Sequence, residues 1–360
     1  MATARLTSWA VIVPVLALAL VGAALWLPVG TLFLALAVPA LFGAVLAAVH
    51  HAEVVAHRVG EPFGTLVLAV AVTVIEVSLI VSMMLAGGPD KSALPRDTIF
   101  SAIMIICNGA VGLCLLAGGL KHHEQTFRLE GATSALATLI ALATLSLVLP
   151  TFTTSAPGAR YTGIQLAFAA AASLVLWGAF IFVQTVRHRD YFLPRADTAD
   201  ESTHAPPPSD GAAWASFGLM LVALLAVIGL AKAMSPAMER GIEAAGAPQT
   251  VIGIVIALLV LLPETWAAVR AARADRLQTS LNLALGSALA SIGLTIPVVA
   301  LVAVLLDMPL QLGLAAKDLV LLALTFAVGA ITLGTGRTNV LQGAVHLVIF
   351  AAFLVLALVP

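Results

Sequence analysis

The stretch that decides the fold is FGTLVLAVAVTVIEVSLIVSMML, residues 63–85. It is a continuous apolar run, and about 20 apolar residues are enough for a helix to cross a bilayer. One acidic side chain, Glu76, stands near its middle. An ionised group at the centre of a membrane helix costs at least about 2.5 to 3.5 kcal/mol on insertion scales, so it indicates a function. The alternative for Glu76 is a structural hydrogen bond.

A second apolar run, VIGIVIALLVLLPETWAAV at residues 251–269, carries Glu264. The chain therefore has one intramembrane glutamate in each half. Glu264 lies six residues before Arg270. The alternative for it is a position near the cytoplasmic end of the span, with the side chain extended into the interface.

The composition is that of a membrane protein. The chain has 360 residues, of which 61% are hydrophobic and 10% charged, and its mean hydropathy is +1.09. Soluble domains carry about 25% charged residues, so we predict an all-α polytopic membrane protein. The net charge is -1 and no basic run is present, which argues against nucleic acid as a partner. Cys107 and Cys114 lie in one apolar run and are predicted to be buried thiols.

Apolar runs separated by charged or Pro/Gly-rich breaks predict eleven spans. They are roughly 8–27, 30–49, 63–86, 98–120, 131–150, 162–186, 212–234, 248–269, 279–306, 318–335 and 339–359. The first run resembles a signal peptide, but a second span follows at once, so we expect it to remain as a helix.

The lysines and arginines predict the orientation. With the N-terminus in the cytoplasm, alternate loops place 11 of them inside and 6 outside. The cytoplasmic set is Arg5, Arg58, Lys121, Arg128, Arg187, Arg189, Arg195, Arg270, Arg273, Arg276 and Arg337. The outer set is Lys91, Arg96, Arg160, Lys232, Arg240 and Lys317. The excess predicts a cytoplasmic N-terminus and an external C-terminus.

The longest polar break, residues 187–211, divides the chain. It is rich in proline and acidic residues and is predicted to be a flexible cytoplasmic linker. A cation-sensing acidic segment is the sharper alternative. If residues 1–29 form an extra N-terminal helix, residues 30–186 and 212–360 make two sets of five helices. Odd-numbered repeats insert with opposite orientations, the inverted plan of many secondary transporters.

The glutamates suggest a chemistry of exchange. A carboxylate in a low-dielectric site holds a proton tightly unless a cation replaces it. Calcium prefers oxygen ligands, and Thr73, three residues before Glu76, offers a hydroxyl on the same helical face. Pro263 directly precedes Glu264, and a proline within a helix frees a backbone carbonyl, here that of Leu259.

The helix after each glutamate adds polar residues. After Glu264, small and hydroxyl residues recur about once per turn: Ser280, Ala284, Ser287, Ser291 and Thr295. After Glu76, Ser101, Asn108 and Gly112 form a thinner version. Packing surfaces are the alternative, because small residues commonly line helix contacts in membranes. A packing role is favoured for His346 and Asn339.

Four stretches carry a resemblance to a known family: residues 50–80 (HHAEVVAHRVGEPFGTLVLAVAVTVIEVSLI), 96–127, 262–299 and 334–354 (GTGRTNVLQGAVHLVIFAAFL). Through them the chain resembles the calcium/cation antiporter superfamily, and within it the ChaA-type bacterial cation/proton antiporters. The resemblance covers most of the chain and is weakest in the linker.

The resemblance implies two inverted repeats, with the family's glutamates at Glu76 and Glu264 and its Gly-Ser pair at Gly286 and Ser287. It implies a bacterial inner-membrane antiporter that exchanges cytoplasmic cations for external protons by alternating access. Calcium/proton exchangers usually carry Gly-Asn-Ala-Thr-Glu around each glutamate. Here the glutamates follow Thr-Val-Ile and Leu-Leu-Pro, which indicates a less selective site.

We therefore predict a cation/proton antiporter with Glu76 and Glu264 as metal and proton ligands. Thr73, Ser101, Asn108, Ser287 and Ser291 are predicted as further binding residues. Calcium is the leading ion, and sodium and potassium are further candidates. No cofactor is implied; the partners are lipid, inorganic cations and protons.

A monovalent sodium or potassium/proton antiporter without calcium transport is the alternative. A cation channel is a distant one, because no stretch resembles a filter loop. An intramembrane enzyme is not expected, since motifs such as His-Glu-x-x-His are absent.

Overall fold

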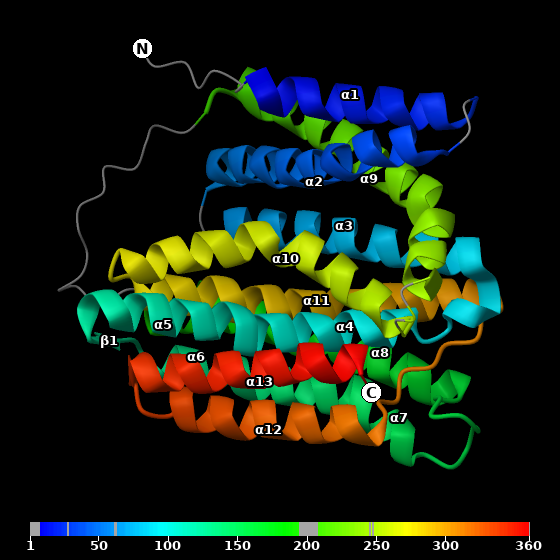
Figure 1. The fold of residues 1–360 in the computed structure, drawn as a ribbon. Helices are drawn as coiled ribbons and strands as arrows, with labels where there is room; N and C mark the ends of the chain where they lie inside the picture. Colours follow the sequence, from blue (N-terminus) through cyan, green and yellow to red (C-terminus); the bar gives the residue numbers. More distant parts are fainter. Residues whose placement is uncertain are drawn as a thin grey trace. The chain divides into compact units, whose positions relative to one another are not determined.

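The structure, a computed structural model, describes residues 8–26, 29–60, 63–193, 208–244, 246 and 248–359. It is almost entirely helical (Figure 1). Within these residues, nine helices are long and apolar enough to cross a membrane, and Trp9–Ala24 and Val70–Leu85 are shorter apolar helices. Each of the eleven predicted spans is thus a helix. The prediction of an all-α polytopic membrane protein is confirmed.

The elements in chain order are α1 (Ser8–Ala24), α2 (Thr31–Val59), α3 (Phe63–Gly87), η1 (Gly88–Lys91), α4 (Leu94–Met104), η2 (Ile105–Ala110), α5 (Val111–His122), β1 (Glu124–Thr126), α6 (Leu129–Ala143), η3 (Thr144–Val148), α7 (Leu149–Phe152), α8 (Gly163–Phe182), η4 (Val183–Arg187), η5 (Arg189–Phe192), α9 (Asp210–Ala244), α10 (Thr250–Arg273), α11 (Leu277–Leu305), α12 (Ala316–Leu333), β2 (Arg337–Asn339) and α13 (Val340–Leu358). Segments η2, η3 and η4 are π-helical.

Several helices extend past the apolar runs that predicted them. Helix α2 continues ten residues beyond the predicted end at 49 and stops at Val59, before Gly60 with φ +77°. Helix α9 continues through Pro236 to Ala244, instead of ending at 234. The apolar run marks the part of the helix that lies in the bilayer. The helix itself ends only where a residue adopts a non-helical backbone conformation.

The chain forms two compact units. The first unit comprises Met1–Lys91 and Thr203–Gly246. In it α9 packs against α1, α2 and α3. The buried His51 of α2 donates from Nε2 to the Ala10 carbonyl of α1 (2.9 Å). Arg58 Nε donates to Asp210 Oδ1 (2.7 Å), which joins the end of α2 to the start of α9.

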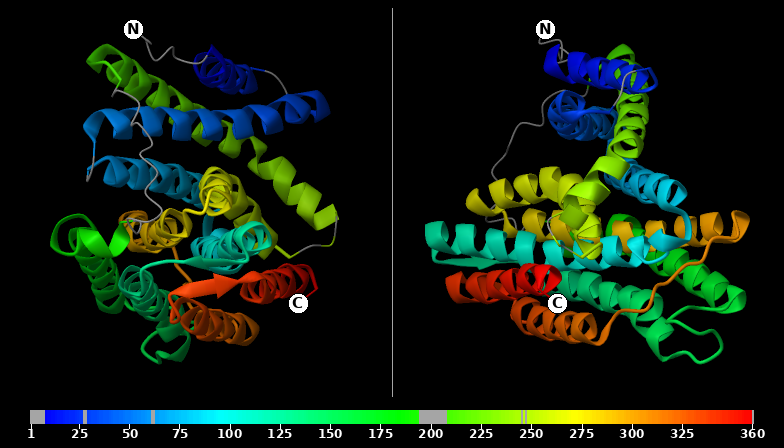
Figure 2. Two further views of the ribbon diagram at one scale, coloured as in Figure 1. Left: turned by 90° about the vertical axis from the view of Figure 1, so that its left-hand side faces the viewer. Right: turned by 45° about the vertical axis from the view of Figure 1, so that its right-hand side comes forward.

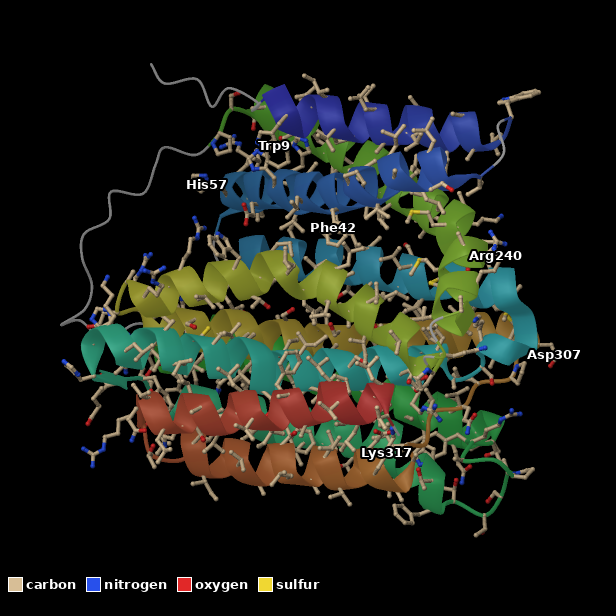
Figure 3. The ribbon with its side chains drawn as sticks, in the orientation of Figure 1. Trp9, Phe42, His57, Arg240, Asp307 and Lys317 are labelled. Atoms are coloured by element: carbon tan, nitrogen blue, oxygen red, sulfur yellow. The ribbon has the colours of Figure 1, made fainter. Side chains whose placement is uncertain are left out.

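The second unit comprises Ser92–Ser202 and Ala247–Pro360. At its centre is the continuous segment Leu94–His122, made of α4, η2 and α5, whose apolar stretch is 89% buried. Helices α10, α11 and α13 pack against this segment. Helices α12 and α13 lie side by side (Figure 2), and Lys317 at the start of α12 donates from Nζ to the Leu356 carbonyl of α13 (2.6 Å; Figure 3).

A short strand pair adds to the helical fold. Strands β1 and β2 are antiparallel, with Gln125 opposite Thr338. This pair is not predictable from the sequence, because three-residue strands carry little periodicity. It joins the connection after α5 to the connection between α12 and α13, which lie more than 200 residues apart in the chain.

The basic residues at each end of the second unit are ones that the predicted alternation of loops places on the same side of the membrane. At one end, Lys121 Nζ donates to the Arg273 carbonyl (2.9 Å), and Arg337 lies in the strand paired with β1. All three were predicted on one side of the membrane. At the other end, Arg96 Nη1 donates to the Gly313 carbonyl (3.2 Å), and Gly313 N donates to the Ala159 carbonyl (3.0 Å).

The first residues of the predicted linker are folded. Segment η5 buries Phe192, whose ring meets that of Phe180 edge-on at 5.7 Å. Asn282 Nδ2 donates to the Phe192 carbonyl (2.6 Å). Residues 194–207 of the linker, which include Arg195, and the N-terminal residues 1–7, which include Arg5, lie outside the described residues.

Candidate functional site

The first predicted glutamate lies within α3, in the first unit. Glu76 is 2% exposed and Thr73 5% exposed. Their neighbours Ile75, Leu79 and Ile80 are also buried. A helix satisfies its own backbone hydrogen bonds at this depth, so α3 carries a carboxylate into an apolar environment without breaking. Helix α3 of the first unit therefore carries a buried acid, Glu76, and a buried hydroxyl, Thr73, on one face.

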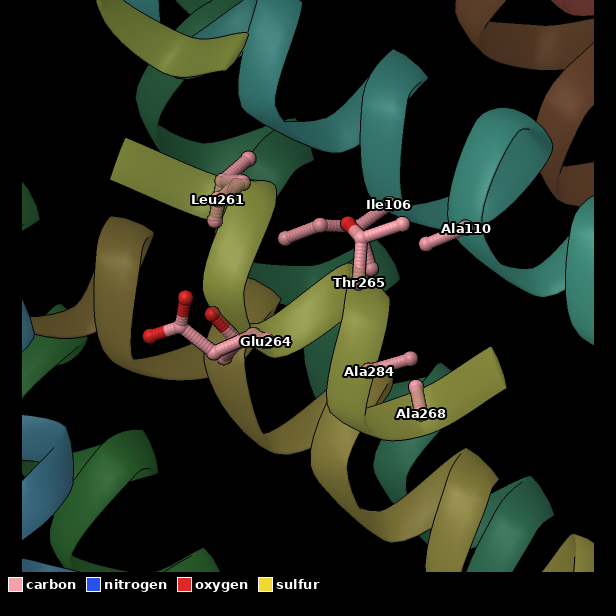
Figure 4. A pocket seen from close by; sticks show the side chains of 8 residues that line it. Ile106, Ala110, Leu261, Glu264, Thr265, Ala268 and Ala284 are labelled. Atoms are coloured by element: carbon pink, nitrogen blue, oxygen red, sulfur yellow. The ribbon is translucent and has the colours of Figure 1, made fainter. Parts of the chain in front are cut away.

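The second predicted glutamate lines a cavity in the second unit. Glu264 is half-buried, and α10 remains helical through Pro263. The cavity is lined by Ile106, Ala110, Leu261, Glu264, Thr265, Ala268, Ala284 and Ser287. Figure 4 shows α10 beside the segment that carries Ile106 and Ala110, with the Thr265 side chain directed toward them.

The size and lining of this cavity suit a single small particle. Its volume is about 10 Å³, close to the minimum that one water molecule needs. Glu264 is the acidic residue of the lining, and the hydroxyl residues Thr265 and Ser287 accompany it. None of the eight lining residues is basic. A carboxylate in such surroundings is stable when it holds a proton or a cation, and hydroxyl oxygens are ligands that hard cations accept.

The hydroxyl stripe of α11 faces the interior of the second unit. Ser280, Ser291 and Thr295 are at most 2% exposed, and Ala284 is 4% exposed. Ser287 is half-buried and, with Ala284, lines the Glu264 cavity. The structure thus brings Glu264 and Ser287 to one cavity, and Ser291 follows one turn later.

The polar residues predicted after Glu76 have other contacts. Ser101 Oγ donates to the Asp97 carbonyl of its own helix (2.6 Å). Asn108 is fully buried and its amide contacts α12 and α13: Nδ2 donates to Thr325 Oγ1 (2.8 Å), and Oδ1 accepts from His346 Nδ1 (3.1 Å). Neither residue lines the Glu264 cavity, whereas Ile106 and Ala110, next to Asn108, do.

Three hydroxyl residues around these groups were not among the predicted site residues. Thr265 directly follows Glu264 and lines its cavity; its place beside the glutamate was the available signal. Thr325 and Thr332 of α12 bond Asn108 and His346. Their spacing of seven residues places them on one helical face. Asn339, for which packing was favoured, caps α13 by accepting from Leu341 N (3.0 Å).

The described residues contain no group of three or more His, Cys, Asp or Glu side chains arranged to hold a metal ion. An ion at Glu264 would therefore depend on hydroxyls, carbonyls and water in addition to carboxylates. Such a set suits an ion that binds and leaves during transport. Helices long and apolar enough to cross a membrane, one of which carries an acidic residue into the lining of a small cavity, are features of multi-pass membrane transport proteins.

Comparisons with known proteins specify the family. The family model described as sodium/calcium exchanger protein matches residues 29–186 and 215–359. The chain belongs to this family, whose members are secondary transporters. Two curated relatives cover most of it. The putative ionic transporter y4hA of Sinorhizobium fredii is 54% identical, with 89% of this chain and 87% of that protein aligned. The sodium-potassium/proton antiporter ChaA of Escherichia coli is 37% identical, with 95% and 94% aligned.

A more distant relative is also similar to this chain, and two solved structures share its fold. The Ca(2+)/H(+) antiporter of Aphanothece halophytica is 24% identical, with 74% of this chain and 75% of that protein aligned. Native YfkE shares the fold with a TM-score of 0.73 at 16% identity, covering 97% of this chain and 99% of that one. The H+/Ca2+ exchanger CAX does so with a TM-score of 0.67 at 14% identity, covering 95% and 87%.

Proposed function

We propose that the protein exchanges cytoplasmic cations for external protons across the bacterial inner membrane by alternating access. The observation that carries the proposal is the small Glu264 cavity, whose lining combines an acidic residue with the hydroxyl residues Thr265 and Ser287. Glu76, buried in α3, is the second proposed binding group. Membership of the exchanger family supports both assignments.

The proposed cycle is a competition between protons and a cation for the same carboxylates. Protons entering from outside neutralise Glu76 and Glu264, and the cation loses its ligands and leaves. The protonated protein then opens to the cytoplasm, releases its protons and binds another cation. The proton gradient drives the exchange, because each proton that enters lowers the affinity for the departing cation.

Calcium is the leading candidate ion, since carboxylate and hydroxyl oxygens are the ligands that it prefers. The similarity to the Ca(2+)/H(+) antiporter of Aphanothece halophytica supports this ion. Sodium and potassium are the second candidates. The higher similarity to the sodium-potassium/proton antiporter ChaA supports these two ions. The absence of an amide from the lining of the Glu264 cavity is compatible with both.

The proposed architecture is an extra N-terminal helix, residues 1–29, followed by inverted repeats at 30–186 and 212–360. The two stretches matched by the family model, 29–186 and 215–359, support this division. We propose a cytoplasmic N-terminus and an external C-terminus from the excess of basic residues in alternate loops.

The test uses inverted membrane vesicles with an acidified lumen and a pH-reporting dye. Calcium, sodium and potassium are added in separate runs. We expect wild-type protein to dissipate the proton gradient with at least one ion, and Glu76→Gln and Glu264→Gln to stop this, because an amide cannot exchange a proton for a cation. Glu130→Gln, on the exposed first turn of α6, is the matched control and keeps full activity.

The outcomes separate the candidates. Full activity in either glutamine variant, with equal amounts of protein in the membrane, would remove that glutamate from the mechanism. A response to sodium or potassium alone would assign a monovalent antiporter. Currents in a planar bilayer far above exchange rates would favour a channel.

A further inference from the structure

A buried polar network joins three elements of the second unit. It consists of Asn108 from η2, Thr325 and Thr332 from α12, and His346 from α13. All four residues are at most 2% exposed. Buried polar groups at membrane depth are costly unless they form hydrogen bonds with one another. Such a network is therefore expected to have a structural or functional role.

The hydrogen positions in the network follow from its chemistry. Asn108 Oδ1 can only accept, so His346 Nδ1 donates to it (3.1 Å). In the neutral imidazole Nε2 is then an acceptor, and Thr332 Oγ1 donates to it (3.1 Å). Asn108 Nδ2 donates to Thr325 Oγ1 (2.8 Å), which donates to the Leu321 carbonyl (2.7 Å). Each of these donors has an acceptor, as a stable buried network requires.

The network includes a residue of η2, the segment that forms one wall of the Glu264 cavity. Segment η2 is a π-helix, a rare form that holds one extra residue in its turn and frequently occurs at functional sites. Asn108 is part of this turn and reaches toward α12 and α13. Ile106 and Ala110, from the same turn, line the cavity. The network therefore holds one side of the π-helix while the other side faces the site.

Close packing of α13 against α5 brings His346 next to η2. A Cβ atom added at Gly112 would lie 3.1 Å from the Cβ of His346, so α13 approaches α5 directly next to η2. If the π-helix relaxed to an α-helix, its extra residue would move into the helix on one side of the turn. The residues on that side would rotate by about 100° about the helix axis. Such a rotation would move Ile106 or Ala110 out of the cavity wall.

We infer that His346 is a positioning residue for cation binding at Glu264. Through Asn108 it keeps η2 in the π-helical form that shapes the cavity. This inference rests on the proposed function, and it assigns to α13 a role in affinity in addition to packing.

The test compares three substitutions of His346 in proteoliposomes, with the KM for the transported cation and the maximal rate as readouts. His346→Asn places an amide donor near the position of Nδ1 and preserves the bond to Asn108. His346→Gln places its amide near the position of Nε2, and His346→Leu has no donor. His57→Leu, at the exposed end of α2, is the control.

We expect His346→Leu and His346→Gln to raise the KM about tenfold, the factor that the loss of one buried hydrogen bond corresponds to. Their maximal rates stay within about twofold of wild type, and His346→Asn keeps a KM within about twofold. If His346 served stability alone, all three variants would have a lower thermal midpoint, and none would raise the KM while keeping the maximal rate. An unchanged KM in His346→Leu, or equal effects of Asn and Leu, would overturn the inference.

A second measurement is independent of transport. Amide hydrogen exchange over residues 104–112 is expected to be faster in His346→Leu and His346→Gln than in wild type and His346→Asn. If wild-type protein exchanged none of the three cations, the proposed function would fail. The hydrogen exchange would still decide whether His346 holds η2, and equal protection in all four proteins would refute that.

Discussion

The Glu264 cavity has room for about one water molecule, so each polar atom of its lining matters individually. An ion bound in so small a space would lose its hydration shell, and under the proposed function the hydroxyls of the lining would replace part of it. Ser287 of α11 is the hydroxyl that both the sequence pattern and the cavity lining indicate. Its removal is the most direct test of the cavity as a cation site.

We predict that Ser287→Ala raises the KM for the transported cation about two- to tenfold, the range for the loss of one neutral hydrogen-bonding group. Ser173→Ala is the control, since Ser173 is a buried helix serine that does not line the cavity and whose Oγ donates to the Ala169 carbonyl within α8. Cation titrations in proteoliposomes give both values. Equal KM values in the two variants would remove Ser287 from the site.

A tyrosine outside the spans gives a prediction with a defined pH dependence. Tyr161 Oη donates to the Leu145 carbonyl (2.5 Å) of the π-helix η3, and burial raises the pKa of the Tyr161 phenol. The neutral phenol therefore stabilises the fold fully below about pH 10, the pKa of unfolded tyrosine. This contribution falls as the pH rises, because the unfolded state loses its proton first.

Tyr161→Phe is expected to lower the free energy of unfolding by about 1 kcal/mol near neutral pH, the value of one hydrogen bond. The difference from wild type shrinks above about pH 10. Thermal unfolding in detergent at about pH 8 and about pH 10.5 measures it. Tyr191→Phe, at the other tyrosine of the chain, is the control. A difference that is constant with pH would contradict the assigned role of the phenol.

At the level of elements, the helix that carries Glu264 is held at its C-terminal end. The last carbonyls of a helix have no partner within it. Here Lys121 Nζ and His122 Nε2 donate to the Arg273 carbonyl (2.9 and 3.0 Å), and Gln125 Nε2 donates to the Ala272 carbonyl (2.9 Å). Residues of α5 and β1 therefore fix the end of α10.

Helices α5 and α13 are in backbone contact at Gly343. A Cβ atom there would lie 2.5 Å from the Leu116 nitrogen and 3.0 Å from the Gly112 carbonyl oxygen. Because neither backbone atom can move independently, the two helices would have to separate. Small residues at such crossings are what allow membrane helices to approach closely.

Gly343→Ala is expected to destabilise the protein by about 1 to 3 kcal/mol, the cost of overpacking a core. Gly178→Ala on α8 is the matched control, since its Cβ would meet no atom within 4 Å, and alanine there is neutral or stabilising by up to about 1 kcal/mol. Thermal midpoints in detergent measure both. Equal midpoints would show that the contact of α5 and α13 is looser than described.

For the whole molecule, the segregation of charge predicts its orientation in the membrane. The residues that gather at the β1–β2 end of the second unit belong to the larger basic set. Those at the Gly313 end belong to the smaller set. The positive-inside rule therefore assigns the β1–β2 end to the cytoplasm.

We predict that a cysteine at Glu124 reacts with a membrane-impermeant maleimide only in inverted vesicles, and a cysteine at Ser155 only in intact spheroplasts. Both positions are exposed. The native Cys107 and Cys114 are buried and are replaced by alanine as background. The opposite pattern would reverse the orientation. Reaction of both sites from one side would contradict the predicted alternation of spans.

The amino-acid sequence by itself determined the class of protein and its two acidic positions. A membrane helix satisfies its backbone hydrogen bonds within one segment, so a sufficiently long apolar run is enough to predict it. For the same reason Glu76 and Glu264 could be recognised as exceptional from their immediate neighbours. The residues proposed around them, such as Ser287 and Ser291, followed from helical periodicity.

Only the tertiary structure decided which residues meet. The bond of Asn108 to His346, the pairing of β1 with β2, and the presence of Ile106 and Ala110 beside Glu264 all join residues more than 150 positions apart. No local pattern encodes such contacts, because they depend on how complete helices pack. The π-helical turn at Ile105–Ala110 is of the same kind. A π-helix is rare compared with an α-helix, and we infer that the contacts from α12 and α13 hold this one in place.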